Sequence, residues 1–183
     1  MANEKIREMI SRQEILGETP ITIDMVKAIM TAHHIDHLGL EDGDIKNRFL
    51  NGVYREGSEK RYAEQHCNIV SWFNSKEMML NFCKAAFNSK ILRGQVSAWI
   101  NGWSAKDGYT FVLKVATKNA ELGKFVTRRG SWKTVDASPC SNMVIVLELV
   151  SMNNSPNAGF RIKSCYPAPT NVEYDAHMKK VAR

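Results

Sequence analysis

Apolar residues recur at helical spacing along the first third of the chain. The spacing predicts a loosely attached helix within residues 1–18 and a longer helix over residues 23–36, for which Thr22 supplies the N-cap. A short helix is expected over residues 44–51, and the polar stretch over residues 51–68 predicts a long loop. This part of the chain is therefore expected to be helical.

The pattern changes from helical periodicity to alternation in the second half. Two more helices are expected first, the earlier opened by Asn74 or Ser75 and the later one ending at Gly102. β-Branched and aromatic residues then alternate with polar ones, which predicts strands over residues 109–117, 123–128, 132–135, 143–150 and 159–166. The polar turn between the last two strands predicts an antiparallel hairpin. Helices followed by strands indicate an α+β fold with an antiparallel sheet.

This organisation predicts three parts. Residues 1–20 are expected to form an appendage helix, residues 21–169 the main domain, and residues 170–183 a polar, peripheral tail. The longest apolar run, residues 143–150, is too short to cross a bilayer, so no membrane partner is expected. The N-terminal residues lead into no apolar stretch, so no secretory signal is expected.

The net charge indicates a class of partner, and the cysteine spacing indicates whether disulfides or a zinc site are expected. The net charge of +6 favours polyanions, of which nucleic acid is the commonest. The four cysteines, at positions 67, 83, 140 and 165, form no CxxC pair and no zinc-type spacing. We expect free buried thiols, with Cys83 and Cys165 packed as small hydrophobic residues.

Three of the five histidines gather at His33, His34 and His37. His33 and His37 lie four residues apart and would share one face of the predicted helix. Three interpretations are open: a structural cluster at a helix C-terminus, two ligands of a metal site, or acid/base chemistry near neutral pH.

Two further positions offer chemistry. Arg48 is either a surface arginine or a guanidinium that binds a phosphate through two parallel hydrogen bonds. In the last strand, alternation places Phe160, Ile162, Ser164 and Tyr166 on one face and Arg161, Lys163 and Cys165 on the other. A hydroxyl and a phenol would then stand side by side, although Tyr166 also fits a half-buried core aromatic.

These positions belong to an ordered set of motifs within residues 30–169. The set comprises His37-Leu-Gly39 with Asp42–Arg48; Ser71-Trp-Phe73-Asn74 through Trp99–Gly102; Gly123–Arg129 with Val144-Ile-Val-Leu147; and Phe160-Arg-Ile-Lys-Ser164-Cys-Tyr166-Pro167. It resembles the ribonuclease A-like toxin domains at the C-termini of bacterial contact-dependent inhibition and other polymorphic toxins. The resemblance implies N-terminal helices packed on a curved antiparallel sheet.

The resemblance also implies an activity. A metal-independent endoribonuclease without a cofactor would cleave RNA, such as tRNA, by attack of the 2′-OH, leaving a 2′,3′-cyclic phosphate. His37, Arg48, Ser164 and Tyr166 would be catalytic. The expected substrate-binding residues are Lys46, Lys163, His33 and His34.

The resemblance further implies a biological setting. Such a domain is delivered as the C-terminal part of a larger toxin, acts in the target-cell cytoplasm and has a cognate immunity protein. Two departures from the family pattern are present: Ser164 stands where threonine is usual, and Ala32 occupies the place of a second histidine. A non-catalytic RNA-binding or interaction domain and a histidine-based metal nuclease remain the alternatives.

Overall fold

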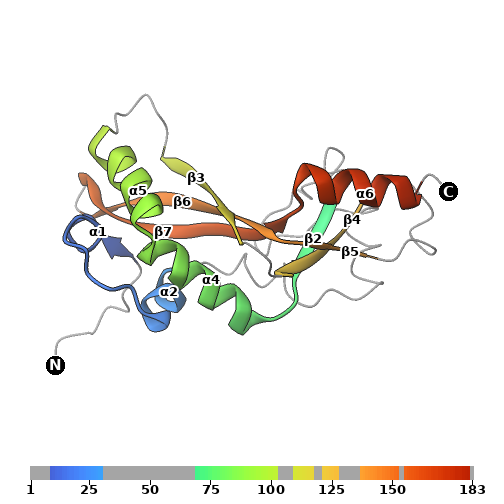
Figure 1. Cartoon of the computed structure of the whole chain (residues 1–183). Coiled ribbons are helices and arrows are strands. Elements are labelled where there is room, and N and C mark those ends of the chain that lie inside the picture. The colour runs from blue at the N-terminus through green and yellow to red at the C-terminus, as the bar shows by residue number, and fades with distance from the viewer. Residues whose placement is uncertain are drawn as a thin grey trace, which may run out of the picture. The chain divides into compact units, whose positions relative to one another are not determined.

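The computed structural model describes residues 9–30, 69–102, 109–117, 121–127, 137–152 and 155–181. The described elements are β1 (Ile10–Ser11), α1 (Arg12–Leu16), α2 (Ile23–Ile29), β2 (Ile69–Phe73), α4 (Lys76–Asn88), α5 (Lys90–Gly102), β3 (Thr110–Ala116), β4 (Gly123–Thr127), β5 (Ser138–Cys140), β6 (Asn142–Met152), β7 (Ser155–Ala168) and α6 (Asn171–Val181) (Figure 1). The predicted α+β class is confirmed.

The chain divides into two compact units. The first contains Met1–Ile35, Lys76–Val115 and Val144–Cys165, and the second contains Asp36–Ser75, Ala116–Met143 and Tyr166–Arg183. The strands form a four-stranded sheet in the order β1-β7-β6-β3 and a three-stranded sheet in the order β2-β4-β5. The predicted hairpin is present as β6 and β7, which are hydrogen-bonded neighbours separated by two residues and therefore antiparallel.

In the first unit, α4 and α5 cover one face of the four-stranded sheet (Figure 1). Phe87 of α4 packs on Phe160 of β7 with ring centroids 5.8 Å apart, and Trp99 of α5 stacks on Phe111 of β3 at 5.1 Å. Alternate residues of the strands complete this core, because successive side chains of a strand point to opposite faces. Leu113, Ile145, Leu147 and Phe160 are fully buried.

The N-terminal segment is partly a strand. Helix α1 is confined to Arg12–Leu16 and begins with a capping box, in which Ser11 Oγ accepts from Glu14 N and Ser11 N donates to Glu14 Oε2. Before it, Ile10 is fully buried and pairs antiparallel with Phe160. The helix is thus shorter than the 1–18 periodicity predicts. The division of the chain into residues 1–20, 21–169 and 170–183 stays a prediction.

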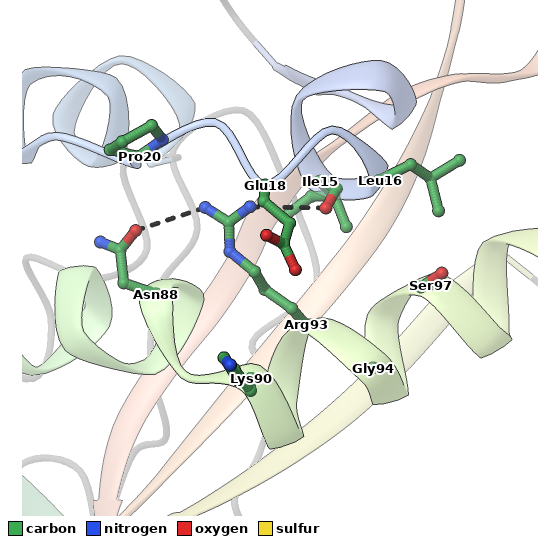
Figure 2. A pocket seen from close by; sticks show the side chains of 9 residues that line it. All are labelled: Ile15, Leu16, Glu18, Pro20, Asn88, Lys90, Arg93, Gly94 and Ser97. Carbon is green, nitrogen blue, oxygen red and sulfur yellow. Dashed lines mark hydrogen bonds between the residues drawn. The ribbon is translucent and has the colours of Figure 1, made fainter.

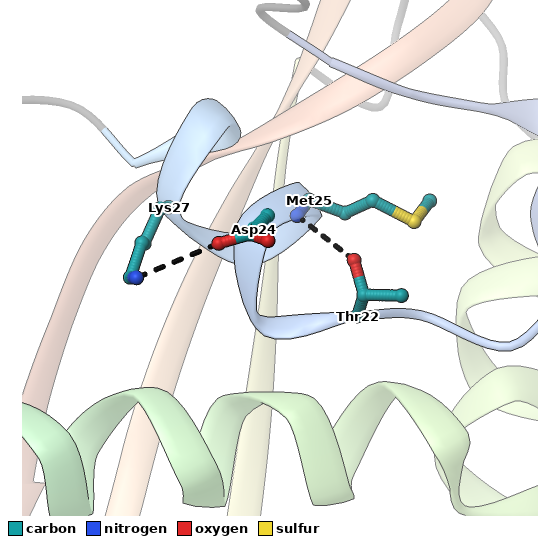
Figure 3. Close-up of polar contacts among 4 residues, drawn as sticks. All are labelled: Thr22, Asp24, Met25 and Lys27. Atoms are coloured by element: carbon teal, nitrogen blue, oxygen red, sulfur yellow. Dashed lines mark hydrogen bonds and ion pairs between the residues drawn. The ribbon is translucent and has the colours of Figure 1, made fainter.

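Helix α2 has the predicted N-cap but not the predicted length. Thr22 Oγ1 accepts from Met25 N at 3.2 Å, and Lys27 pairs with Asp24 at 3.5 Å (Figure 3). The expectation that the helix reaches residue 36 is wrong, because α2 ends at Ile29 and Met30 adopts an extended backbone. Met30 instead forms a parallel bridge with Ile162 of β7. At Met30, backbone pairing with the sheet therefore takes the place of the predicted helical conformation.

In the second unit, β2, β4 and β5 form an antiparallel sheet in which Phe73 pairs with Gly123 and Val70 with Val126. Val70, Trp72 and Val126 make its small core. The sequence patterns did not indicate β2, β5 or α6, and the predicted peripheral tail is the helix α6. The helix expected over residues 44–51, the loop over 51–68 and the strand over 132–135 lie outside the described residues.

Candidate active site

The two predicted hydroxyl residues lie where β7 approaches its end. Ser164 and Tyr166 are each half-buried, and they alternate with the buried Cys165 and Pro167. Ser164 belongs to the first unit and Tyr166 to the second. The strand placement of both residues is as predicted, and their catalytic roles stay a prediction.

The face assignment of Cys165 needs correction. Phe160 contacts Phe87 and Cys165 contacts Cys83, so both β7 residues lie against α4, although they are five positions apart. Strict alternation would place residues five apart on opposite faces. The alternation breaks at Lys163 and Ser164, two adjacent residues that are both partly exposed. An irregularity of this kind changes the direction of a side chain relative to a regular strand.

The three cysteines in the described part of the chain have buried, free thiols. Cys83, Cys140 and Cys165 are unpaired and fully buried, and the sulfur atoms of Cys83 and Cys165 are 3.7 Å apart. Burial raises the pKa of Cys165 well above its usual value, and the contact with Cys83 raises it further. These thiols pack as small hydrophobic residues, as predicted. Cys67 lies outside the described residues.

A charged group precedes Ser164 on the same strand. Arg161 donates from Nε to Glu148 Oε2 at 3.0 Å and places Nη2 at 2.9 Å from the same oxygen, and Lys163 Nζ lies 3.7 Å from Glu148 Oε1. Both cations thus lie against the one carboxylate of Glu148. Lys163, predicted to bind substrate, is therefore held by a carboxylate, with its side chain 44% exposed. Partly exposed pairs of this kind rearrange at little cost when a phosphate competes.

The remaining predicted site residues are His33, His34, His37, Lys46 and Arg48, and they lie outside the described residues. The end of α2 at Ile29 means that this helix does not carry His33 and His37 on one face. The convergence of His37, Arg48, Ser164 and Tyr166 stays a prediction. Among the described residues, no three His, Cys, Asp or Glu side chains are grouped so that they could hold a metal ion.

His177 was not predicted and is fully buried in the second unit. Its Nδ1 lies 2.8 Å from Ser138 Oγ, its Nε2 lies 3.3 Å from Thr127 Oγ1, and its ring packs against Phe125 at 4.8 Å. Burial lowers the pKa of His177, and the charge of Lys180 lowers it further. The hydroxyl partners and the absence of exposure indicate a structural imidazole that fixes α6 on the β2-β4-β5 sheet.

The sequence signal that could have revealed α6 is a capping box at the start of this helix. Thr170 N donates to Glu173 Oε2 at 2.8 Å, and Glu173 N donates to Thr170 Oγ1 at 3.2 Å. Burial alone would raise the pKa of Glu173, but hydrogen bonds from Ser141 and Thr170 outweigh it and lower the pKa. A Thr-x-x-Glu pattern with His177 four residues after Glu173 therefore predicts a docked helix.

The lowered pKa of His177 makes the stability of the folded chain pH-dependent. The unfolded chain binds the proton more readily, so the free energy of unfolding should fall as pH drops from 7 through 6.5 towards the folded pKa. We expect His177→Gln, which keeps a donor and an acceptor, to flatten this dependence. Urea unfolding of both proteins between pH 7 and pH 5 checks it, and identical pH slopes would contradict the assignment.

The first unit contains a pocket of about 420 Å³ between α1, the segment after it with Glu18 and Pro20, the end of α4, and α5 (Figure 2). Arg93 lies in it but donates to the backbone carbonyls of Phe87 at 2.7 Å, Glu14 at 3.3 Å and Ile15 at 3.4 Å. Because these carbonyls accept the hydrogen bonds of the guanidinium, Arg93 joins the ends of α1 and α4. Among the predicted site residues that the structure describes, neither Lys163 nor Ser164 nor Tyr166 lines this pocket.

Comparison with protein-family models finds no match, and comparison with curated proteins finds none either. Among solved structures, the chain is similar to a chain of the crystal structure of a CdiA-CT/CdiI complex from Y. kristensenii 33638. The TM-score is 0.54 at 18% sequence identity, and the alignment covers 76% of this chain and 100% of that chain. At this identity the likeness establishes a shared fold. None of the helices in the described residues is long and apolar enough to span a membrane.

Proposed function

We propose that this chain is the toxin domain of a contact-dependent inhibition system and that it cleaves RNA without a metal ion. The observation that carries the proposal is the fold likeness to a chain of a CdiA-CT/CdiI complex, which spans the whole length of that chain. Two features of this sequence support it: the net charge of +6 and the Ser164-Cys-Tyr166-Pro167 end of β7.

The proposed reaction uses a nucleophile that the substrate carries. The 2′-oxygen of RNA attacks the adjacent phosphorus, the bond from phosphorus to the 5′-oxygen breaks, and a 2′,3′-cyclic phosphate remains. One proton must leave the 2′-OH and another must reach the departing 5′-oxygen. His37 is the residue proposed for general base or acid, because imidazole exchanges protons near neutral pH. DNA lacks the 2′-OH and should not be cut.

The remaining proposed residues bind the phosphate, stabilise its negative charge and position the RNA. Arg48 would bind the phosphate oxygens and stabilise the negative charge that develops on them. Ser164 and Tyr166 would donate hydrogen bonds to the phosphate or orient a base, and the Tyr166 ring offers a surface for stacking. Lys46 and Lys163, with His33 and His34, would bind the rest of the polyanion. No cofactor takes part in this scheme.

The partners follow from the same proposal. The fold neighbour is described with CdiI, and we propose a cognate immunity protein for this chain, with an acidic face that covers the proposed active site. The chain would be delivered as the C-terminal part of a larger toxin and act in the cytoplasm of the target cell. Co-purification with the product of a neighbouring gene tests the partner.

The activity is tested by incubating the chain with bulk tRNA in excess EDTA, with single-stranded DNA of matched length as the control. Cleavage of the RNA alone supports the proposal. Cleavage that EDTA abolishes would instead indicate a metal nuclease built on His33 and His37. Binding of tRNA without cleavage would indicate a non-catalytic RNA-binding domain.

Ser164 gives a prediction within the described residues. Ser164 is half-buried on β7, so its hydroxyl is partly accessible to a substrate. Ser164→Ala should lower kcat about tenfold, the loss expected when one hydrogen bond to the transition state is removed. Ser164→Thr restores the hydroxyl and should keep most of the activity. Equal losses in the two variants, measured on tRNA, would argue against a role for the hydroxyl.

A further inference from the structure

The residue after Tyr166 is held by a buried hydrogen bond from a distant strand. Ser71 Oγ of β2 donates to the carbonyl oxygen of Pro167 at 2.7 Å, and Ser71 is only 7% exposed. Proline has no N–H, so this carbonyl is the one backbone group through which Pro167 can be hydrogen-bonded. The two residues are 96 positions apart, and both belong to the second unit.

A glycine forms the other side of this contact. A Cβ atom on Gly123 of β4 would lie 2.7 Å from Pro167 Cγ and closer still to the carbonyl oxygen of Trp72. Both distances are shorter than real Cβ contacts, so a side chain at this position would displace the proline ring. Gly123 pairs with Phe73, two residues after Ser71 on β2. Ser71 and Gly123 thus hold the carbonyl and the ring of Pro167.

The backbone of Tyr166 is constrained as a consequence. The proline ring fixes its own φ angle and restricts the preceding residue to an extended backbone. Since the ring and the carbonyl of Pro167 are both held, the starting point of the Tyr166 side chain is fixed on the β2-β4 sheet.

We propose that Ser71 and Gly123 form a seat for Pro167 that positions the phenol of Tyr166, so that Ser71 is a positioning residue of the active site. This inference rests on the proposed function, in which Tyr166 contacts the RNA. It also gives a physical reason why the Ser71-Trp-Phe73 segment and the Tyr166-Pro167 pair occur in one chain: the first supplies the donor that holds the second.

A kinetic cycle separates positioning from a merely structural role. Ser71→Ala leaves the Pro167 carbonyl without its donor and should lower kcat about tenfold, with KM changed less than about twofold, because small displacements of a catalytic group slow the chemical step. In a Tyr166→Phe background, the same substitution should cost almost nothing further. An equal loss in both backgrounds would overturn the proposal, and so would full activity of Ser71→Ala.

A second measurement does not depend on activity. With ¹³C-labelled tyrosine, the Tyr166 signal is assigned by its loss in Tyr166→Phe, and Ser71→Ala should shift it more than the signals of the other tyrosines. Ser138→Ala is the matched control, because Ser138 is a buried serine of the same unit that bonds to His177 instead. It should leave the Tyr166 signal in place.

The kinetic and the spectroscopic measurement test the seat and the proposed ribonuclease activity separately. If the wild-type chain does not cleave RNA but Ser71→Ala shifts the Tyr166 signal, the proposed ribonuclease activity fails and the seat is supported. If Ser71→Ala leaves the Tyr166 signal unchanged, the seat is refuted, whatever the activity of the wild-type chain.

Discussion

Replacing His37 with alanine should lower the rate of RNA cleavage by about 10²- to 10⁴-fold, the range that a general acid or base contributes. The physical reason is that His37 is the group to which the mechanism assigns proton transfer, and imidazole exchanges protons near pH 7. The measurement is kcat/KM on tRNA in excess EDTA for the wild type and His37→Ala. The affinity for RNA should change little, because basic side chains supply most of the binding to phosphates.

His66→Ala is the control for this experiment, since His66 belongs to none of the motifs that define the site. It should retain the wild-type rate. If His37→Ala cleaves RNA as fast as the wild type, another group exchanges the proton and the proposed mechanism is wrong. Equal losses in the two variants would point to a general effect on folding.

Replacing Phe160 with alanine should lower the free energy of unfolding by about 3–5 kcal/mol, the usual cost of removing a buried aromatic side chain. Phe160 is fully buried, packs on Phe87 of α4 and pairs with Ile10 of β1. The substitution therefore leaves a cavity where a strand and a helix of the first unit meet. Urea unfolding monitored by circular dichroism gives the change.

Ile91→Ala provides the comparison, because Ile91 is of similar hydrophobicity but 74% exposed. Its effect should stay within about 0.5 kcal/mol, as for other surface substitutions. A loss for Phe160→Ala as small as that for Ile91→Ala would contradict the packing of β7 against α4.

Local patterns in the sequence predicted the elements whose cores are formed by regular periodicity. Alternation located β3, β4, β6 and β7, helical spacing located α4 and α5, and Thr22 was correctly identified as an N-cap. In β3, for example, buried residues alternate with exposed ones over the second half of the strand. Local sequence therefore carries enough information for these segments.

The strands β2 and β5 and the early end of α2, which the sequence patterns did not indicate, depend on contacts between distant residues. Strand β2 is five residues long and is defined by its pairing with β4, about 50 positions later, and β5 is a three-residue strand around Pro139. Helix α2 stops early because Met30 pairs with Ile162. No periodicity of a single segment reports such pairings, which tertiary structure imposes on local preference.

In the candidate site, too, some features could be predicted from the local sequence and others could not. The terminal strand and the half-buried position of Tyr166 were predictable from the sequence. The break in alternation at Lys163 and Ser164 was not, because strict alternation would place Cys165 on the face opposite Phe160. The contact between Ser71 and Pro167 joins residues 96 positions apart and needs coordinates to be seen. The roles of His37 and Arg48 remain predictions.

The most direct test of the central claim is the chemistry of the ends that cleavage leaves. Bulk tRNA is digested with the wild-type chain in excess EDTA, and the 3′ ends of the fragments are identified by mass spectrometry. Attack by the 2′-OH predicts fragments that end in a 2′,3′-cyclic phosphate, with 5′-hydroxyl groups on their neighbours. Fragments with 3′-hydroxyl and 5′-phosphate ends would contradict it, since they require attack by water.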